Sequence, residues 1–360
     1  MRKPDKRPKY SLFLWRRHKK IEKKRKIAKE RVKTIRRSLQ GKSSFQILEF
    51  RKYQRYEHVV APKKFLFLNN TQETINFINK LGYFLKKRKS VFVDLNLVED
   101  IDYGAITVML SVMIEFKRLK INFNGNFPLN RLVRDKLQSS QFFDRLNKPI
   151  ISESEYSIQK TDQIFTKANK VVVPLLGYNV MQEASKTIWG EKRMCKGLQR
   201  VFLELMQNTH NHASFEQEGE MFWWLSVNHD VENKKVSFVF VDYGLGIFES
   251  LSNKPAESKW SGYLQKIKTR VGYENNAEIL HKLLDGELHL TVTGKSFRGK
   301  GLPGIREVLK RNQISNLRII SNNVSADVFN AQYNLLGNKF NGTFLYWELC
   351  QSNENKIWNI

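Results

Sequence analysis

The segment "LELMQNTHNHAS", residues 203–214, joins an apolar beginning to a polar end. Leu205 and Met206 are typical of a buried helix face, whereas Glu204, Asn208 and His212 follow one another at intervals of four. Because a helix turns once in 3.6 residues, these three side chains are expected on one face. A carboxylate and an amide one turn apart suit divalent-metal and water chemistry, since both offer oxygen ligands and the carboxylate accepts protons. On an isolated helix, the same pattern is also typical of a solvated surface.

A second motif is the stretch "VSFVFVDYGLG", residues 236–246. Its alternating side chains predict a strand that runs into Asp242, and Gly244 and Gly246 follow. A carboxylate at a strand end suits the exocyclic amine of a purine. The two glycines permit positive φ and a close ligand approach. Alone, this D-x-G-x-G pattern is equally typical of an ordinary strand-to-loop turn.

A third motif, "GKSFRGKGLPGIREVLKR", spans residues 294–311. Gly299, Gly301 and Gly304 open a helical pattern, and free N–H groups at a helix N-terminus bind anions. Three cations add positive charge to the same loop: Lys295, Arg298 and Lys300. The sequence therefore predicts a phosphate site here.

Near the chain's end, "NGTFLYWEL", residues 341–349, predicts a strand preceded by Gly342 and Thr343. The order E-L-x-x-N-x-x-x-H, D-x-G-x-G, G-x-G-L and G-T resembles that of the GHKL ATPase superfamily, which includes DNA gyrase, heat-shock chaperones, mismatch-repair ATPases, histidine kinases and anti-sigma-factor serine kinases. The resemblance covers residues 178–349. It implies a two-layer α/β sandwich with helices on one face of a mixed sheet. ATP and Mg²⁺ would bind beneath a mobile lid at about residues 248–297.

The resemblance also implies a role for each motif residue. Asn208 is the implied Mg²⁺ ligand, Asp242 the adenine-amine acceptor and Glu204 the general base for water attack. The other implied nucleotide contacts are Gly244 and Gly246 beside the base, Gly299, Gly301 and Leu302 around the triphosphate, and Thr343 behind Asp242. The predicted anion site adds Gly304, Lys295, Arg298 and Lys300. His212 completes the helix motif, and core packing suits it as well as chemistry does.

Between residues 57 and 150, strand and helix patterns alternate, which predicts a small α/β domain. The expected elements are a strand at 65–68, a helix at 70–88 with Thr71 as its N-cap, a strand at 90–95, a helix from Asp102 to Arg118, a strand at 121–124 and a helix from Leu129. Residues 151–174 read as a connector passing into a strand. A helical pattern then runs from about Met181 to His212 with breaks near Gly190 and Gly197.

The stretch "VFVDLNLVEDIDYGAITVMLSVM", residues 91–113, resembles the central signature of STAS domains. In that signature a strand ends in Asp-Leu and a second Asp, here Asp102, caps the next helix. Phospho-switching members carry Ser or Thr directly afterwards, where this chain has Tyr103 and Gly104; the nearest Ser or Thr hydroxyl after Asp102 is that of Thr107. The resemblance therefore implies a module that supports or recruits, without the usual phosphorylation.

Composition sets the wider limits. A length of 360 residues accommodates two or three domains, and 41% apolar residues indicate a globular protein. Two cysteines exclude a disulfide framework and a four-cysteine zinc site. No apolar run approaches the roughly 20 residues of a spanning helix. These features predict a cytoplasmic protein without a transmembrane segment or a secretory signal.

The net charge of +27 is concentrated at the N-terminus. Residues 1–42 hold 19 Lys and Arg against three acidic residues, a net +16 that leaves +11 for the rest. Together with the two resemblances, this charge distribution divides the chain into three parts: a partly helical basic arm (1–56), a STAS-like domain (57–150) and a GHKL domain (151–360). A narrow apolar seam of the arm comprises Ala28, Val32, Ile35 and Leu39. The arm is compatible with docking on its own chain or a second copy, with nucleic acid or an acidic partner, and with an anionic membrane.

These features predict an ATP-binding regulatory ATPase whose slow hydrolysis drives lid closure and switches a protein partner or a homodimer. One alternative is a Ser/Thr protein kinase of the anti-sigma-factor partner-switching type. Another is an ATP-gated protein that binds nucleic acid through residues 1–42. In gyrase and the chaperones, a transducer domain supplies a lysine that contacts the phosphates. Only about ten residues follow the last predicted strand here, so the corresponding lysine is expected to be Lys295, Lys300 or a residue of another chain.

Overall fold

The computed structural model describes residues 15–27, 29–30, 55–147, 163–168, 172–212, 223–252, 275–287 and 301–353. The chain divides into two compact units, Met1–Tyr56 and Glu57–Ile360. The second unit combines helices with parallel and antiparallel sheets, which confirms the predicted mixed α/β class. In the first unit residues 15–27 are helical, and the predicted seam of Ala28, Val32, Ile35 and Leu39 lies outside the described residues. Within the described ranges, no helix has the length and apolarity needed to cross a membrane.

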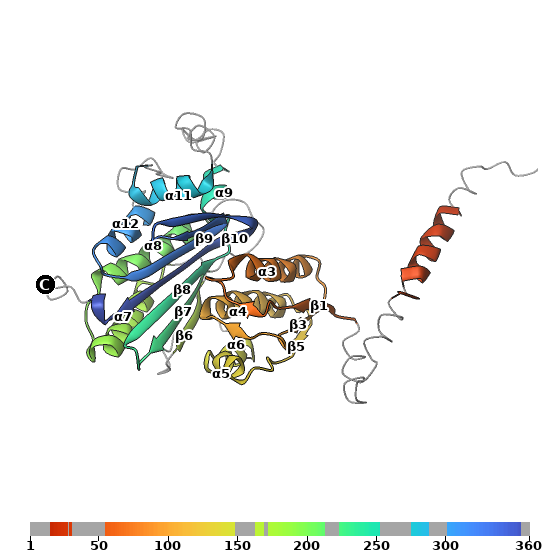
Figure 1. Ribbon diagram of the computed structural model, residues 1–360, viewed down its shortest axis with the longest axis horizontal. Helices are drawn as coiled ribbons and strands as arrows, with labels where there is room; N and C mark the ends of the chain where they lie inside the picture. Colours follow the sequence, from red (N-terminus) through yellow and green to blue (C-terminus); the bar gives the residue numbers. More distant parts are fainter. Residues whose placement is uncertain are drawn as a thin grey trace, which may run out of the picture. The chain divides into compact units, whose positions relative to one another are not determined.

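The N-terminal half of the second unit is built on parallel strands (Figure 1). Three strands pair in the order β1-β3-β5 and two shorter ones pair as β2-β4. The strands are β1 (Glu57–Val60), β2 (Lys64–Phe65), β3 (Val91–Asp94), β4 (Asp100–Ile101) and β5 (Phe123–Gly125). The helices are α3 (Thr71–Lys86), α4 (Tyr103–Arg118), α5 (Arg131–Ser139) and α6 (Phe142–Asn147).

Asp102 caps α4 as the sequence predicted. Its carboxylate accepts hydrogen bonds from the backbone N–H groups of Ala105 at 2.6 Å and Phe67 at 2.7 Å. One other local prediction was wrong, and another was confirmed only in part. The N-cap of α3 is Asn70 rather than Thr71. The strand expected at 65–68 stops after Phe65, because the chain turns there towards α3.

The C-terminal half contains a five-stranded sheet in the order β6-β7-β8-β10-β9, and every pairing in it is antiparallel. The mixed sheet implied by the family resemblance is therefore not found among the described strands. The strands are β6 (Gln163–Ala168), β7 (Trp223–Asp230), β8 (Lys235–Asp242), β9 (Ser315–Asp327) and β10 (Gln332–Cys350). The helices are α7 (Pro174–Trp189), α8 (Lys196–His212), α9 (Gly246–Ser252), α11 (Asn276–Asp285), α12 (Gly301–Lys310) and the short η1 (Gln351–Asn353).

The break predicted at Gly190 is confirmed, because this residue ends α7 in a left-handed conformation with φ of 81°. The second break, predicted near Gly197, is not separate from the first, because a single interruption at residues 190–195 divides α7 from α8. Gly197 is the second residue of α8, and the interruption lies before Lys196. The last strand also begins earlier than predicted, at Gln332, so that Gly342 and Thr343 lie within β10.

Both faces of the five-stranded sheet are buried, each against different helices (Figure 1). On β8, Phe238 and Phe240 join the core formed with α7, α8, α11 and α12. Val239 and Val241 alternate with them and join the core formed with α3 and α4. A strand that is buried on both faces needs apolar residues at nearly every position, which explains the run "VSFVFV".

Small and aromatic residues bring the two halves together. A β-carbon added at Gly104 would lie 3.0 Å from the ring of Phe344 on β10. The same ring lies 4.4 Å from that of Phe67. The hydroxyl of Tyr243, directly after β8, lies 2.6 Å from Ser111 Oγ of α4 and donates to the carbonyl of Val108 at 3.2 Å. Burial raises the pKa of Tyr243.

Replacing Tyr243 with Phe is expected to lower the free energy of unfolding by about 1 kcal/mol, because the variant loses the hydroxyl's hydrogen bonds between the two halves. Urea unfolding of the full chain measures the change. Tyr333→Phe is the matched control, since the buried hydroxyl of Tyr333 has no hydrogen-bond partner in the described structure. Equal stability of Tyr243→Phe and wild type would contradict the importance of this contact.

Candidate functional site

Asp242 lies in a row of four side-by-side residues on neighbouring strands. It pairs with Trp223 of β7 and with Thr343 of β10, and Thr343 pairs with Ser321 of β9. Because side chains of a strand alternate between faces, Asp242 continues the series of Phe238 and Phe240. The carboxylate is therefore on the sheet face that α7 and α8 cover.

The carboxylate of Asp242 is buried and incompletely paired. The residue is 9% exposed, and its Oδ1 has no hydrogen-bond partner in the described structure. Burial raises the pKa of Asp242 to about 6. The N–H of Gly244 donates to the carboxylate, and this hydrogen bond partly offsets the rise in pKa. A buried acceptor without a donor costs free energy unless a ligand supplies one. The structure thus offers a hydrogen-bond acceptor at the predicted position.

Gly342 allows β10 to pass close to Asp242. Its φ is +136°, and a β-carbon at this position would overlap the backbone oxygen of Asp242. Any side chain here would separate the strands next to the pair formed by Asp242 and Thr343. The glycine preceding Thr343 is therefore required by the backbone.

Replacing Gly342 with Ala is expected to lower the free energy of unfolding by about 3 kcal/mol or more, from backbone strain and overlap together. Thermal and urea unfolding measure the change. Gly82→Ala on α3 is the control with the opposite expected sign, since no atom lies within 4 Å of the added β-carbon and Ala favours a helix by up to about 1 kcal/mol. A Gly342→Ala variant as stable as wild type would contradict the close approach.

The glycine loop after β8 is held by two polar residues of β9. Asn322 accepts from the N–H of Phe248 at 3.0 Å and donates to the carbonyl of Leu245 at 2.8 Å. The Ser321 hydroxyl accepts from the N–H of Ile247 at 2.9 Å. Gly246 has a φ of +73°, and a β-carbon there would lie 2.6 Å from Asn322 Oδ1. The loop conformation therefore requires glycine at this position.

The helix of the first motif has the two faces that its spacing predicted. One face is buried and carries Phe202, Leu205 and Met206. The ring of Phe202 makes edge-to-face contacts with Phe238 and Trp347 of the sheet. The partly exposed face carries Glu204 and Asn208. His212 ends α8, and its side chain lies outside the described residues.

The side chains of Glu204 and Asn208 lie next to Gly301, the first residue of α12. A β-carbon at Gly301 would lie 3.3 Å from Glu204 Oε2 and 3.3 Å from Asn208 Nδ2. Leu302 packs against the core that holds both helices. Gly301 therefore leaves room beside a carboxylate and an amide at a helix N-terminus, where free N–H groups favour an anion.

Arg200 adds a cation to this group. It lies one turn before Glu204 on α8, with Nε 3.9 Å from Glu204 Oε1. A β-carbon at Gly304 would lie 2.5 Å from Arg200 Nη2, so Gly304 makes room for the guanidinium. Its spacing of four residues before Glu204 is the sequence signal that indicates this position.

Part of the predicted phosphate loop lies outside the described residues: Lys295, Arg298, Gly299 and Lys300. Of the predicted lid at 248–297, the described parts are the end of α9 and the helix α11 with its flanks. The helix α11 lies within this segment. Its Leu280 and Leu283 are buried in the core, and Asp285 forms an ion pair with Arg306 of α12 at 2.9 Å. In this structure α11 is therefore fixed to α12.

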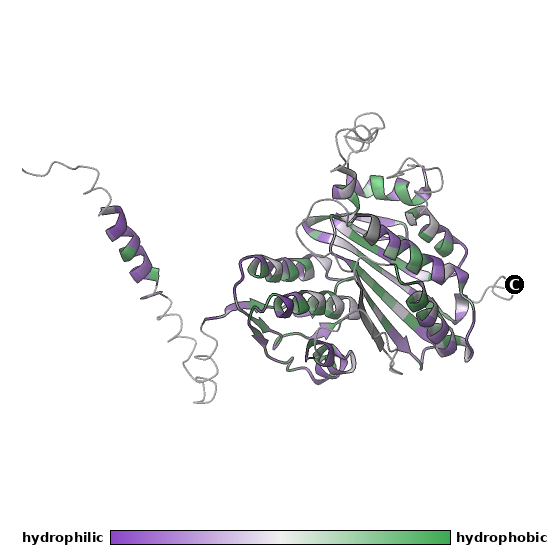
Figure 2. Ribbon diagram, turned by 180° about the vertical axis from the view of Figure 1, so that it is seen from behind, coloured by the Kyte–Doolittle hydropathy of each residue, from purple (hydrophilic) through white to green (hydrophobic). Residues whose placement is uncertain are grey.

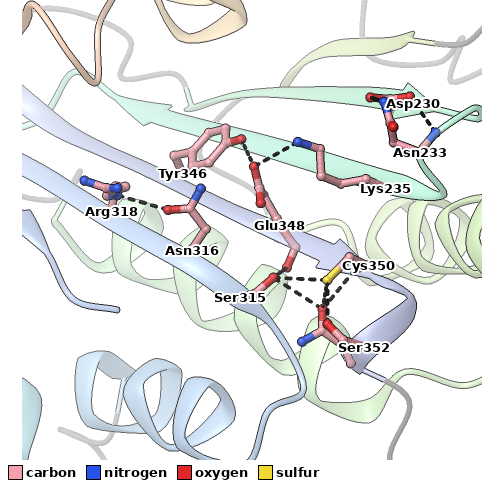
Figure 3. A network of polar contacts seen from close by, with 11 residues as sticks. Asp230, Asn233, Lys235, Ser315, Asn316, Arg318, Tyr346, Glu348, Cys350 and Ser352 are labelled. Atoms are coloured by element: carbon pink, nitrogen blue, oxygen red, sulfur yellow. Dashed lines mark hydrogen bonds and ion pairs between the residues drawn. The ribbon is translucent and has the colours of Figure 1, made fainter. Parts of the chain in front are cut away.

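The opposite end of the same strands carries a separate polar network (Figure 3). Glu348 accepts from the hydroxyl of Tyr346 and pairs with Lys235 at 3.5 Å. Ser315 lies 3.6 Å from the thiol of Cys350. Lys235 begins β8 and Asp242 ends it, so this network does not belong to the candidate site.

The described residues thus form two groups on one sheet face: an acceptor at Asp242 beside a glycine loop, and a carboxylate, an amide and a guanidinium at the start of α12. Searches against family models, curated proteins and solved structures each found no match to this chain.

Proposed function

We propose that this chain binds Mg-ATP as a regulatory ATPase of the GHKL type. The observation that carries the proposal is the buried, unpaired Oδ1 of Asp242, which suits the exocyclic amine of adenine. Thr343 beside it and the constrained Gly246 support the same assignment. Adenine is favoured over guanine because the site presents an acceptor where adenine carries a donor.

The group at α12 would receive the triphosphate. Asn208 would hold Mg²⁺ through its amide oxygen, and Gly301 with the helix N-terminus would cradle phosphate. Glu204 would accept the proton of an attacking water, with Arg200 placed to stabilise negative charge. The γ-phosphoryl group of bound ATP would be transferred to this water, giving ADP and phosphate. The nucleotide state would then switch a protein partner or a second copy of the chain.

The kinase alternative is less well supported for an acceptor in this chain's own STAS-like half. Thr107, the nearest Ser or Thr to the usual phosphorylation position, is fully buried, and its hydroxyl donates to the carbonyl of Tyr103 at 2.6 Å. Gly104 lies against Phe344. A hydroxyl at that position is enclosed between the two halves of the molecule.

Calorimetric titration of the full chain with ATP, with and without Mg²⁺, tests the proposal directly, and GTP serves as the control nucleotide. We expect saturable binding of ATP that strengthens with Mg²⁺ and at least about tenfold weaker binding of GTP. Absence of ATP binding, or equal affinity for GTP, would overturn the assignment of Asp242.

A further inference from the structure

The helical part of the N-terminal arm is almost entirely basic. All residues from 15 to 27 are exposed, and within them Glu22 is the single acidic residue. The cations of this helix are Arg16, Arg17, Lys19, Lys20, Lys23, Lys24, Arg25 and Lys26. Figure 2 shows the helix as mostly hydrophilic. A helix of this charge attracts a polyanion.

The apolar residues of this helix do not form a face. Trp15, Ile21 and Ile27 follow one another at intervals of six, so successive members are about 240° apart around the axis. A helix that lies on a membrane needs its apolar residues on one side. The described helix instead presents cations in nearly every direction, which favours a partner with phosphate groups in water.

A second basic cluster lies on the other unit of the chain. The helices α3 and α4 both connect parallel strands and therefore end at the same edge of the sheet β1-β3-β5. Five exposed cations lie on or just after these helices, and we call them the basic end: Lys80, Lys86, Lys87, Arg88 and Lys120. Among the described residues, no acidic side chain lies within 4.0 Å of their charged groups.

The first residue of the second unit lies beside the basic end. The arm finishes at Tyr56, and Glu57, the next residue, pairs with Lys89 at 2.7 Å just after α3. Tyr83 lies between Lys80 and Lys87 at helical spacing and is 55% exposed. An exposed aromatic ring among cations is the arrangement that stacks on bases of a single strand. Helix-terminal cations also complement the helix dipole, but this effect does not explain Lys80 or the exposed ring.

We infer that the basic end binds single-stranded nucleic acid, with its cations on the phosphate backbone and Tyr83 on a base, and that the basic helix at residues 15–27 makes phosphate contacts of its own. This inference is independent of ATP binding, since none of these residues belongs to the site around Asp242 and Glu204.

The test uses the full chain and two variants, each with five cations replaced by Gln. One variant changes Arg16, Arg17, Lys19, Lys20 and Lys23, and the other changes the basic end. A control variant with the same loss of charge changes exposed cations elsewhere: Lys64, Lys192, Lys234, Lys310 and Arg311. Fluorescence anisotropy follows binding of a labelled 30-nucleotide single strand, and of the corresponding duplex, as the salt concentration is raised from 50 to 300 mM.

For each of the two variants we expect at least about thirtyfold weaker binding at 100 mM salt, and a log–log salt slope that falls by about 3. The control should lose less than about threefold. Tyr83→Ala should weaken the single strand about tenfold and the duplex little. Three results would overturn the inference: no binding at 50 mM salt, equal losses in the control, or tighter binding to phosphatidylserine vesicles or polyglutamate. If Tyr83→Ala weakened single strand and duplex equally, or neither, the assignment of Tyr83 to a base would be wrong.

Discussion

Replacing Asp242 with Asn is expected to reduce the affinity for Mg-ATP about a hundredfold or more. The unpaired Oδ1 accepts the adenine amine in the proposed complex, whereas an amide presents a weaker acceptor or a second donor at the same place. Asp230→Asn is the matched control, because Asp230 ends β7 away from the candidate site and bonds to Asn233 of the following turn. Titration calorimetry at pH 7.5 compares both variants with wild type. Unchanged affinity in Asp242→Asn would remove the nucleotide assignment.

The same substitution is expected to stabilise the protein at neutral pH. Burial raises the pKa of Asp242 from 3.8 to about 6, so the folded state binds the proton more tightly than the unfolded state. The stability linked to this proton is fully present below about pH 3.8 and is lost as the pH rises through 6. At pH 7.5 the charged carboxylate costs roughly 3 kcal/mol, which Asn does not incur.

Urea unfolding at pH 4.5 and pH 7.5 measures this effect. Asp242→Asn should exceed wild type in stability at pH 7.5, and the difference should shrink at pH 4.5. Gain of stability with loss of ATP binding would show that the carboxylate is kept for a ligand. Loss of stability at both pH values would instead assign Asp242 a structural partner and leave the binding result without its proposed explanation.

The sequence predicted those parts of the fold that depend on local pattern. The alternation in "VSFVFV" indicated β8, and the spacing of Glu204 and Asn208 indicated one helix face. Asp102 was expected as a cap because its residue type and position satisfy helix N–H groups locally. Such features depend on neighbours within one turn or one strand, which a single sequence displays.

Features that depend on strand pairing were not predictable in the same way. Asn322 and Ser321 hold the glycine loop 74 positions away in sequence, and the pairing of β9 with β10 brings them there. The prediction of a mixed sheet was wrong for the same reason. Apolar alternation along a strand is the same in parallel and antiparallel sheets, so it does not show how the strands pair. The burial of both sheet faces was visible in the sequence, because Val239 and Val241 are apolar like Phe238 and Phe240. The sequence of β8 alone, however, did not show that α3 and α4 cover its second face.

Replacing Glu204 with Gln is expected to leave the affinity for Mg-ATP within about twofold and to lower ATP turnover about a hundredfold or more. Gln preserves the size of the side chain beside Gly301 but cannot accept a proton from water, and general-base catalysis contributes about 10² to 10⁴ in rate. ATP labelled on its γ-phosphate, followed as free phosphate and as label on protein, measures turnover and transfer together. Glu307→Gln is the control, because Glu307 lies on α12 and pairs with Arg311 at the surface.

Each result of this assay distinguishes a different chemistry. Phosphate released by wild type and by Glu307→Gln, but not by Glu204→Gln, would identify an ATPase with Glu204 as its base. Undiminished release by Glu204→Gln would place the base elsewhere, although the nearby Arg200 would still be available to stabilise phosphate charge. Label on protein would favour the kinase alternative, and the accepting residue would have to be one other than the buried Thr107. Bound ATP without either product would define a nucleotide-gated binding protein, in which Asn208 and Gly301 retain their roles and Glu204 loses its own.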